Sequence, residues 1–311
     1  MNMKKKRVTL ITCIVTGTCI LAGSAFANYS TSNGYDVYKK ALKNLIGMEN
    51  YTMNMSMTVS ADGLEIDRMS FSEKYDLAAG KGSRVESNQR VGDTLSEYKE
   101  IFQDGKRYTL YSSREEQDNA WWIAYPGYTG FGALTVEDND KETVSKVTRF
   151  VELLTDAIVG DLKNNFVYIS ETENGGAKYS VELDAIQIPE LIQAGISAVC
   201  SLNSSNESDY AQNLDYSDVE YYLYHDTSLK SVKCDFEVDN EGRLINNVMS
   251  AEFETTDVND GNHTMTMSME LNMSDYGTTL PDSLPEGAKV RSVEEDGKFV
   301  VTDGEIATED E

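Results

Sequence analysis

The sequence predicts an α+β domain in which a long antiparallel sheet carries about three helices. Apolar and polar residues alternate over 231–238, 247–256 and 264–273, the period of a strand with one buried face. Short turn motifs such as Asp104-Gly105 lie between segments of this kind, as they do in hairpins. Three further segments repeat their apolar residues at the period of a helix.

Twelve segments are predicted to be strands, because they alternate in polarity or are rich in β-forming residues. In chain order these segments are 52–60, 66–77, 95–102, 106–112, 120–125, 165–171, 177–184, 219–224, 231–238, 247–256, 264–273 and 298–302. The last strands of this series are joined by short turns, which favours an antiparallel meander with one dry and one wet face.

Helices are predicted at 35–48, 142–162 and 189–201. In each of them apolar residues return every three or four positions, which gives the helix one apolar face. Pro189 suits the first turn of the third helix, where the missing N–H breaks no hydrogen bond. We expect these apolar faces to pack against the sheet.

The first 27 residues have the pattern of a secretory signal peptide. A basic head at 4–7 precedes an apolar run over 8–21, and Ala25 and Ala27 are the small residues that a signal peptidase requires. The pattern predicts cleavage near Ala27 and an extracytoplasmic, secreted protein. An uncleaved anchor helix is the alternative.

Composition sets the remaining boundaries. The polar segment 28–34 is predicted to be a flexible start, and a single binding domain is expected over 35–285. The acidic segment 286–311 is predicted to be a partly disordered tail. No second apolar stretch is long enough to cross a bilayer, so no transmembrane segment is expected in the mature chain.

The chain is strongly acidic, with 27 Lys and Arg against 53 Asp and Glu and a net charge of −26. The leader holds four of the basic residues and no acidic one, so the mature chain has 23 basic residues and a net charge of −30. This charge repels phosphate backbones, and nucleic acid is not expected as a partner. Acidic runs at 137–140 and 257–261 lack the spacing of a helical calcium loop and are interpreted as solvated turns.

Methionine is concentrated in two of the predicted strands, where branched residues are more usual. Because its side chain is flexible and polarizable, methionine suits a surface that adapts to several apolar partners. The functional interpretation is a cavity wall for an apolar ligand; plain core filling and a copper(I) site are the alternatives. The candidate wall residues are Met53, Met55, Met57, Phe71, Trp122, Phe253, Met265, Met267 and Met269.

Two cysteines follow the leader, Cys200 and Cys234. They could form one disulfide in an oxidising compartment, or both could be buried thiols. A pair is too few for a four-thiolate zinc site, and no metal or cofactor is expected. The histidines His225 and His263 belong to no catalytic motif, so the chain is not expected to be an enzyme.

The order of elements resembles the lipoprotein-carrier superfamily of extracytoplasmic proteins. The resemblance covers about 35–280 and rests on YKKALKNLIGMENYTMNMSMTV at 38–59, on 232–254 and on TMTMSMELNMSDYG at 264–277. It implies a strongly curved, half-barrel sheet with helices in its concave face and an apolar cavity between them. Members with a lipobox are membrane-anchored; this sequence lacks one, which favours a released protein.

The resemblance implies a secreted, non-enzymatic binding protein for an apolar ligand, a lipid or a lipidated protein, held between sheet and helices. The alternative is an extracytoplasmic interaction or envelope-sensor module that meets a protein partner and holds no small ligand. Cavity volume separates the two, because a carrier needs several hundred Å³ of apolar space.

Overall fold

The structure is a computed structural model. The leader, the helix predicted at 142–162, most of the helix predicted at 189–201, Cys200 and the last nine residues lie outside the residues that it describes. The described residues are 34–45, 48–92, 95–113, 121–126, 167–172, 175–188, 190, 193–194, 219–222, 225–293 and 299–302.

These residues form mostly β-structure, in one sheet of 13 strands. The predicted α+β class with three packed helices is therefore wrong for the described chain. Its described helices are α2 (Gly34–Leu45), the four-residue α6 (Val219–Tyr222) and the 3-10 turn η4 (Ala185–Gln187). Residues 190, 193 and 194, within the helix predicted at 189–201, are helical as well. Strand residues outnumber helical residues here because the strands are long, up to 14 residues in β9. The sheet also includes two strands that the sequence did not predict, β3 and β12.

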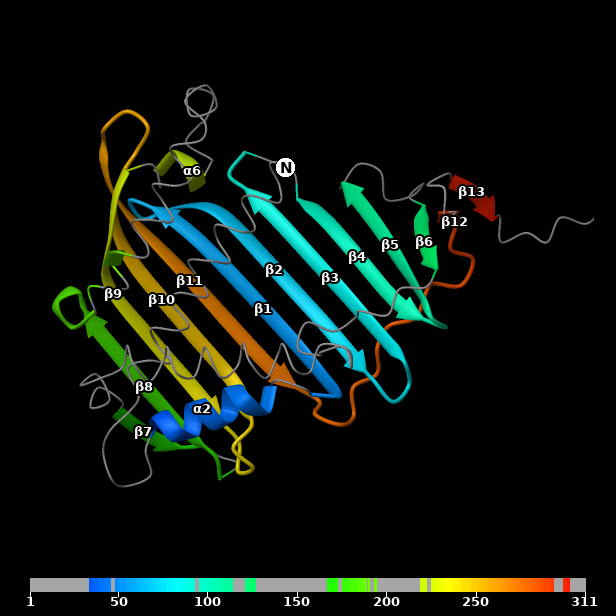
Figure 1. The fold of residues 1–311 in the computed structure, drawn as a ribbon, viewed down its shortest axis with the longest axis horizontal. Helices are drawn as coiled ribbons and strands as arrows, with labels where there is room; N and C mark the ends of the chain where they lie inside the picture. The colour runs from blue at the N-terminus through cyan, green and yellow to red at the C-terminus, as the bar shows by residue number, and fades with distance from the viewer. Residues whose placement is uncertain are drawn as a thin grey trace, which may run out of the picture.

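The strand bounds are β1 (Asn50–Ala61), β2 (Leu64–Asp76), β3 (Lys81–Arg90), β4 (Ser96–Gln103), β5 (Lys106–Ser113), β6 (Trp122–Pro126), β7 (Val167–Glu171), β8 (Ala177–Asp184), β9 (His225–Val238), β10 (Leu244–Thr256), β11 (Asn262–Ser274), β12 (Val290–Val293) and β13 (Phe299–Thr302). Their order across the sheet is β13-β12-β6-β5-β4-β3-β2-β1-β11-β10-β9-β8-β7 (Figure 1). Neighbouring strands are antiparallel except β12 and β6, which are parallel.

Two meanders meet at the centre of this sheet. Strands β1 to β6 follow one another on one side, and β7 to β11 on the other. The junction is the antiparallel pair β1 and β11, whose register runs from Thr52 opposite Ser274 to Ala61 opposite Met265. The domain is thus held together at its middle by strands that are far apart in the sequence.

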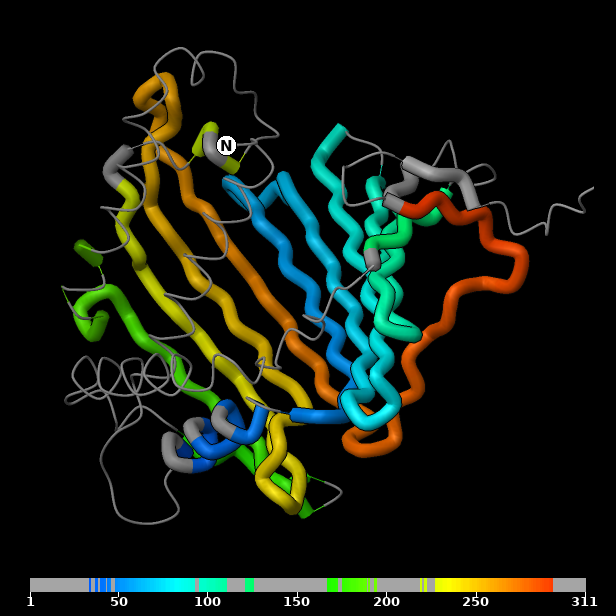
Figure 2. The backbone as a smooth tube through the Cα atoms, turned by 45° about the vertical axis from the view of Figure 1, so that its right-hand side comes forward, coloured from blue at the N-terminus to red at the C-terminus, as the bar shows by residue number. Residues whose placement is uncertain are grey.

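The sheet is strongly curved. In Figure 2 strands β3 to β6 are seen almost edge-on, whereas β9 and β10 remain face-on. Both ends of the sheet bend toward the side on which α2 lies (Figures 1 and 2). We call this side the concave face. Here Tyr38 of α2 packs against Phe236 with ring centroids 4.7 Å apart, and Ala41 and Leu45 are buried in the same core.

The opposite, convex face is crossed by the segment 275–289. Thr279 hydrogen-bonds Thr52 at 2.8 Å, and Asp282 binds both Lys74 at 2.9 Å and Ser83. The segment then leads into β12, beside β6. The sheet therefore continues past the domain boundary expected at 285. None of the helices that the structure describes is long and apolar enough to span a bilayer.

Candidate ligand-binding face

Nine of the twelve methionines in the chain lie on the concave face of four adjacent strands, β2, β1, β11 and β10. Directly paired residues of a sheet share a face, so the register alone assigns them. We call them the methionine cluster: Met53, Met55, Met57, Met69, Met249, Met265, Met267, Met269 and Met273.

The cluster is continuous across the strands. Met57 stands opposite Met69 on one side and Met269 on the other, and Met269 in turn stands opposite Met249. Cross-strand pairs of this kind bring side chains to about 5 Å of one another. Seven of the nine side chains are buried, and Met55 and Met69 are half-buried. The result is an apolar surface built from unbranched, adaptable side chains.

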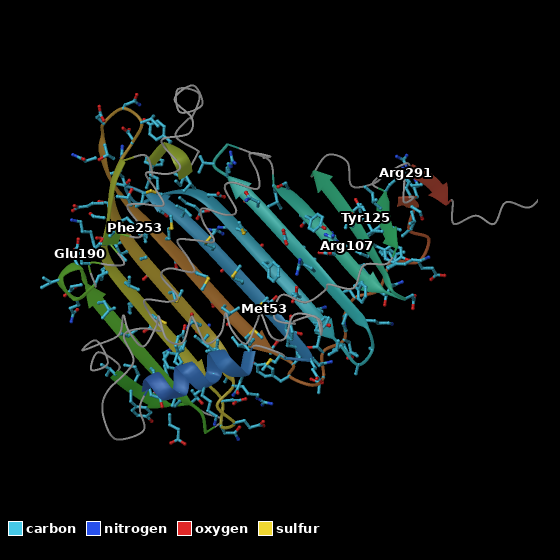
Figure 3. The ribbon with its side chains drawn as sticks, in the orientation of Figure 1. Met53, Arg107, Tyr125, Glu190, Phe253 and Arg291 are labelled. Carbon is cyan, nitrogen blue, oxygen red and sulfur yellow. The ribbon has the colours of Figure 1, made fainter. Side chains whose placement is uncertain are left out.

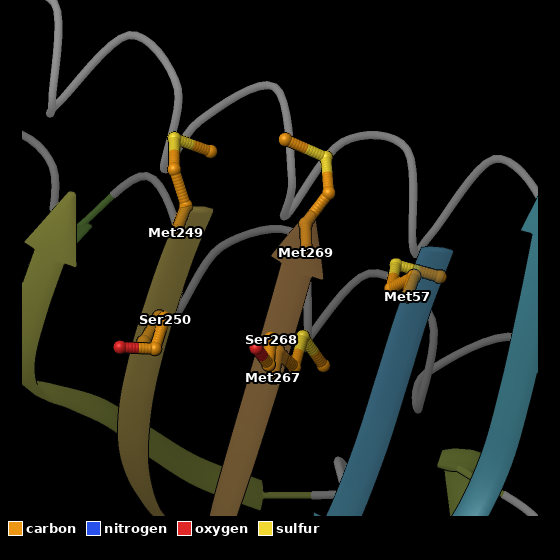
Figure 4. A pocket seen from close by; sticks show the side chains of 7 residues that line it. Met57, Met249, Ser250, Met267, Ser268 and Met269 are labelled. Atoms are coloured by element: carbon orange, nitrogen blue, oxygen red, sulfur yellow. The ribbon is translucent and has the colours of Figure 1, made fainter. Parts of the chain in front are cut away.

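A small pocket lies inside the cluster. It is lined by Met57, Met249, Ala251, Met267 and Met269, with Ser250 and Ser268 beside them. Figure 4 shows Met57, Met249 and Met269 projecting to the same side from three strands. The pocket has a volume of about 10 Å³, room for about one water molecule and far less than an acyl chain requires.

Beyond β2 the concave face becomes charged. The charged cluster consists of Glu73 on β2, Arg84 and Glu86 on β3, Glu100 on β4 and Arg107 on β5. Glu73 and Glu100 are almost fully buried, with 0% and 1% of their surface exposed. Burying charges of this kind is costly unless each one is paired and hydrogen-bonded.

Two arginines neutralise the two buried carboxylates. Arg84 binds Glu73 through Nη2 at 2.7 Å and Glu100 through Nη1 at 3.2 Å, and Arg107 forms a second ion pair with Glu100. The hydroxyl of Tyr51 also donates to Glu73. Arg107 stacks over Tyr125, its partner across β5 and β6 (Figure 3).

Glu86 is the fifth member of the charged cluster and differs from the others. Its register places it between Phe71 and Tyr98, in the row that continues to Met55. Among the residues that the structure describes, its half-buried carboxylate makes no hydrogen bond or ion pair. Burial raises the pKa of Glu86, and the nearby guanidinium of Arg84 opposes this shift.

The candidate wall residues from the sequence are divided between the two faces. The register brings the six methionines together with Phe71 and Phe253 on the concave face. It places Trp122 on the convex face, because the neighbouring Ile123 is the residue in the row of Glu100 and Thr109. Trp122 is buried there and does not line the same surface as the methionines.

The charged cluster was absent from the sequence predictions because β3 was not predicted. Its sequence, KGSRVESNQR, places Gly82, Arg84 and Glu86 at alternate positions. Charges repeated at a spacing of two are the signal that could have indicated a strand with a polar inner row.

Cys234 is buried in β9 and accepts a hydrogen bond from Asn247 at 3.3 Å, while Cys200 lies outside the described residues. The acidic turn 257–261 is an internal hydrogen-bonded loop, in which Asp257 accepts from the backbone of Asn259 and Gly261. In the part of the chain that the structure describes, no three His, Cys, Asp or Glu side chains are grouped as they would be to hold a metal ion.

No protein-family model matches the chain, and no curated protein sequence matches it. Among solved structures it is similar to lipovitellin, in a structure that describes lipid–protein interactions, with a TM-score of 0.24 and 8% identity over 78% of this chain and 26% of that chain. The chain thus spans about a quarter of the lipovitellin chain.

A β-barrel-like protein of a domain of unknown function from Brucella abortus matches with a TM-score of 0.21 and 9% identity, over 74% of this chain and 100% of that chain. A LolA superfamily protein from Nitrosomonas europaea matches with a TM-score of 0.18 and 11% identity, over 81% and 94%. At these TM-scores the similarities carry no argument about function.

Proposed function

We propose that this is a secreted, non-enzymatic binding protein that holds an apolar chain on the concave face of its sheet. The observation that supports the proposal is the methionine cluster: nine flexible side chains on one continuous face of four strands. Each methylene of a bound chain that leaves water contributes about 0.8 kcal/mol. The apolar chain partitions from water onto the methionine side chains, and this binding needs no catalytic group.

The ligand enters by rearrangement of side chains, since the pocket of about 10 Å³ does not hold it as it stands. Methionine has three rotatable bonds and no branch, so it can move aside at a lower cost than Val or Ile. The pocket between Met249, Met267 and Met57 is the point at which we expect the chain to enter.

The small pocket also favours a second candidate, an extracytoplasmic interaction module. In that case the methionines are a closed core, and a protein partner binds elsewhere on the surface. The two candidates differ in one measurable property, the uptake of an apolar molecule by the folded protein.

Native mass spectrometry of the protein purified from its own secretion route distinguishes them. An added mass that organic solvent extracts as lipid is the expected result. A protein that carries no added mass, and that takes up neither added fatty acid nor phospholipid, contradicts the binding proposal and favours the interaction module.

A pair of variants tests the location. Ala251→Leu fills the pocket between Met249 and Met267, at a cost of about 1–3 kcal/mol for overpacking, and should abolish uptake in a protein that remains folded. Thr266→Leu adds an apolar group to the exposed convex side of β11 and should leave uptake unchanged. Equal uptake by the two variants would place the ligand elsewhere.

A further inference from the structure

We propose that the ligand is an amphiphile with a cationic head, and that the head binds at Glu86 while the apolar chain lies on the methionine cluster. This inference rests on the proposed function and identifies the chemical class of its ligand. Its basis is the direct contact, on one concave face, between an apolar surface and a charged cluster that contains one unbalanced carboxylate.

Glu86 lies in a row of paired residues that begins in the methionine cluster. Met55, Phe71, Glu86 and Tyr98 are consecutive partners across β1, β2, β3 and β4. Neighbouring strands lie about 4.8 Å apart, so Glu86 is about 10 Å from Met55. Phe71 stands between them. A chain that covers Met55 and Phe71 therefore ends beside the Glu86 carboxylate.

The charges of this cluster do not balance. The charged cluster contains three carboxylates and two guanidinium groups. Glu73 and Glu100 are bound by Arg84 and Arg107, which leaves Glu86 as the carboxylate with no ion pair among the described residues. The whole chain has a net charge of −26. An ammonium head completes the cluster, whereas a carboxylate or phosphate head meets a site whose arginines are already paired.

The surroundings of Glu86 also favour a cationic partner. Burial raises the pKa of Glu86, because it disfavours the charged carboxylate when nothing cationic lies against it. Phe71 and Tyr98 flank it across the neighbouring strands. Arg84, whose guanidinium lies 5.1 Å from the centre of the Phe71 ring, makes its hydrogen bonds with Glu73 and Glu100. A bound ammonium would offset this cost by pairing with the charged carboxylate of Glu86.

The test compares decylammonium, decanol and decanoate, which share one chain, by isothermal titration calorimetry below their micelle concentrations. With the intact protein near neutral pH, decylammonium should bind at least about tenfold more tightly than decanol, and decanoate most weakly. Glu86→Gln should make decylammonium and decanol equal. Glu252→Gln, which removes the same charge from the exposed convex side of β10, should keep the preference.

The outcomes separate this inference from the proposed function. Equal affinity of the intact protein for decylammonium and decanol overturns the cationic head and leaves binding of an apolar chain in place. Absence of binding for all three overturns the proposed function. A measurement without substitution completes the test: the preference for decylammonium should decline as the pH is lowered and Glu86 is protonated, and a preference that does not change overturns the role of Glu86.

Discussion

The Nδ1 atom of His263 lies 2.7 Å from the Oδ2 atom of Asp62, which joins the start of β11 to the turn between β1 and β2. The other ring nitrogen, Nε2, lies 3.1 Å from Oδ2 of Asp257. Only the protonated ring can donate to both carboxylates. Burial alone would lower the pKa of His263, but the hydrogen bonds with Asp62 and Asp257 outweigh it and hold this pKa above its ordinary value.

This arrangement predicts a fall in stability as the pH rises through neutrality. Because the pKa of His263 is raised by folding, its contribution is complete below about pH 6.5 and is lost as the pH rises through the higher folded-state value. His263→Gln should lower the free energy of unfolding by about 1.5 kcal/mol in acid, and by progressively less at higher pH. Urea unfolding of both proteins over a pH series measures this; two parallel stability curves would contradict it.

Glu73 is fully buried, and its loss should be severe. Glu73→Ala leaves the Tyr51 hydroxyl without this acceptor and removes the closer of the two carboxylates from Arg84. Breaking a buried ion pair from one side costs about 3–5 kcal/mol. The control is Glu241→Ala, which breaks an exposed ion pair with Arg243 and should cost less than about 1 kcal/mol. Chemical denaturation measures the free energy of unfolding of both variants. An equal decrease in the two would show that the buried ion pair stabilises the fold no more than the exposed one.

Replacing methionine by leucine at 249, 267 and 269 should separate adaptability from volume. Each change nearly conserves side-chain volume and should cost less than about 1.5 kcal/mol. The variant should still bind one well-fitting chain but should lose affinity for chains of other lengths and branching, since leucine has fewer conformers. Competition between chains of different length and branching for the protein measures the range of chains that it binds. Met48→Leu, outside the cluster, should leave this range of bound chains unchanged. If Met48→Leu narrows the range as much, the flexibility of the clustered methionines does not set it.

Gly176 should be irreplaceable. A Cβ atom at this position would lie 2.0 Å from the carbonyl oxygen of Val238 and 2.8 Å from Oγ1 of Thr172. Gly176→Ala therefore has to shift β8 from β9 and should cost more than about 2 kcal/mol. At Gly80 a Cβ meets no atom within 4 Å and only the positive φ of 59° opposes it, so Gly80→Ala should cost about 1 kcal/mol. Thermal unfolding of the two variants gives the comparison; a smaller loss at Gly176 would contradict the expected clash.

Much of the sheet could be predicted because burial of one face imposes alternation on the residues. The predicted strand 177–184 coincides with β8, and 52–60 and 264–273 lie within β1 and β11. β3 escaped prediction because its inner row is glycine and charge rather than apolar residues.

The segment 219–224 was predicted to be a strand, and this was wrong for its first four residues, which form α6. Its tyrosines and Val219 are β-forming residues, but tertiary hydrogen bonds hold the short helix. The backbone carbonyls of Tyr221 and Tyr222 accept bonds from Val258 and Thr255. Local propensity cannot reveal partners of this kind, which come from a distant part of the chain.

The candidate face could be predicted only in part. Alternation indicates that the methionines within one strand share a face, as in β1 and β11. It gives no strand order, so it could not show that Trp122 lies on the convex side or that Arg84 stands beside Glu73. Those relations depend on the register across several strands.

The pairing of β1 with β11 has a consequence for how the chain folds. Apart from the long connection between β8 and β9, the strands of each meander follow one another closely and can form early. The central pair instead joins Thr52 to Ser274 and requires the closure of a very long loop. Until β11 emerges, β1 is an open edge that presents Met53, Met55 and Met57 to the solvent. A chain cut short before Asn262 would keep both meanders with their central edges unpaired, a state prone to aggregation.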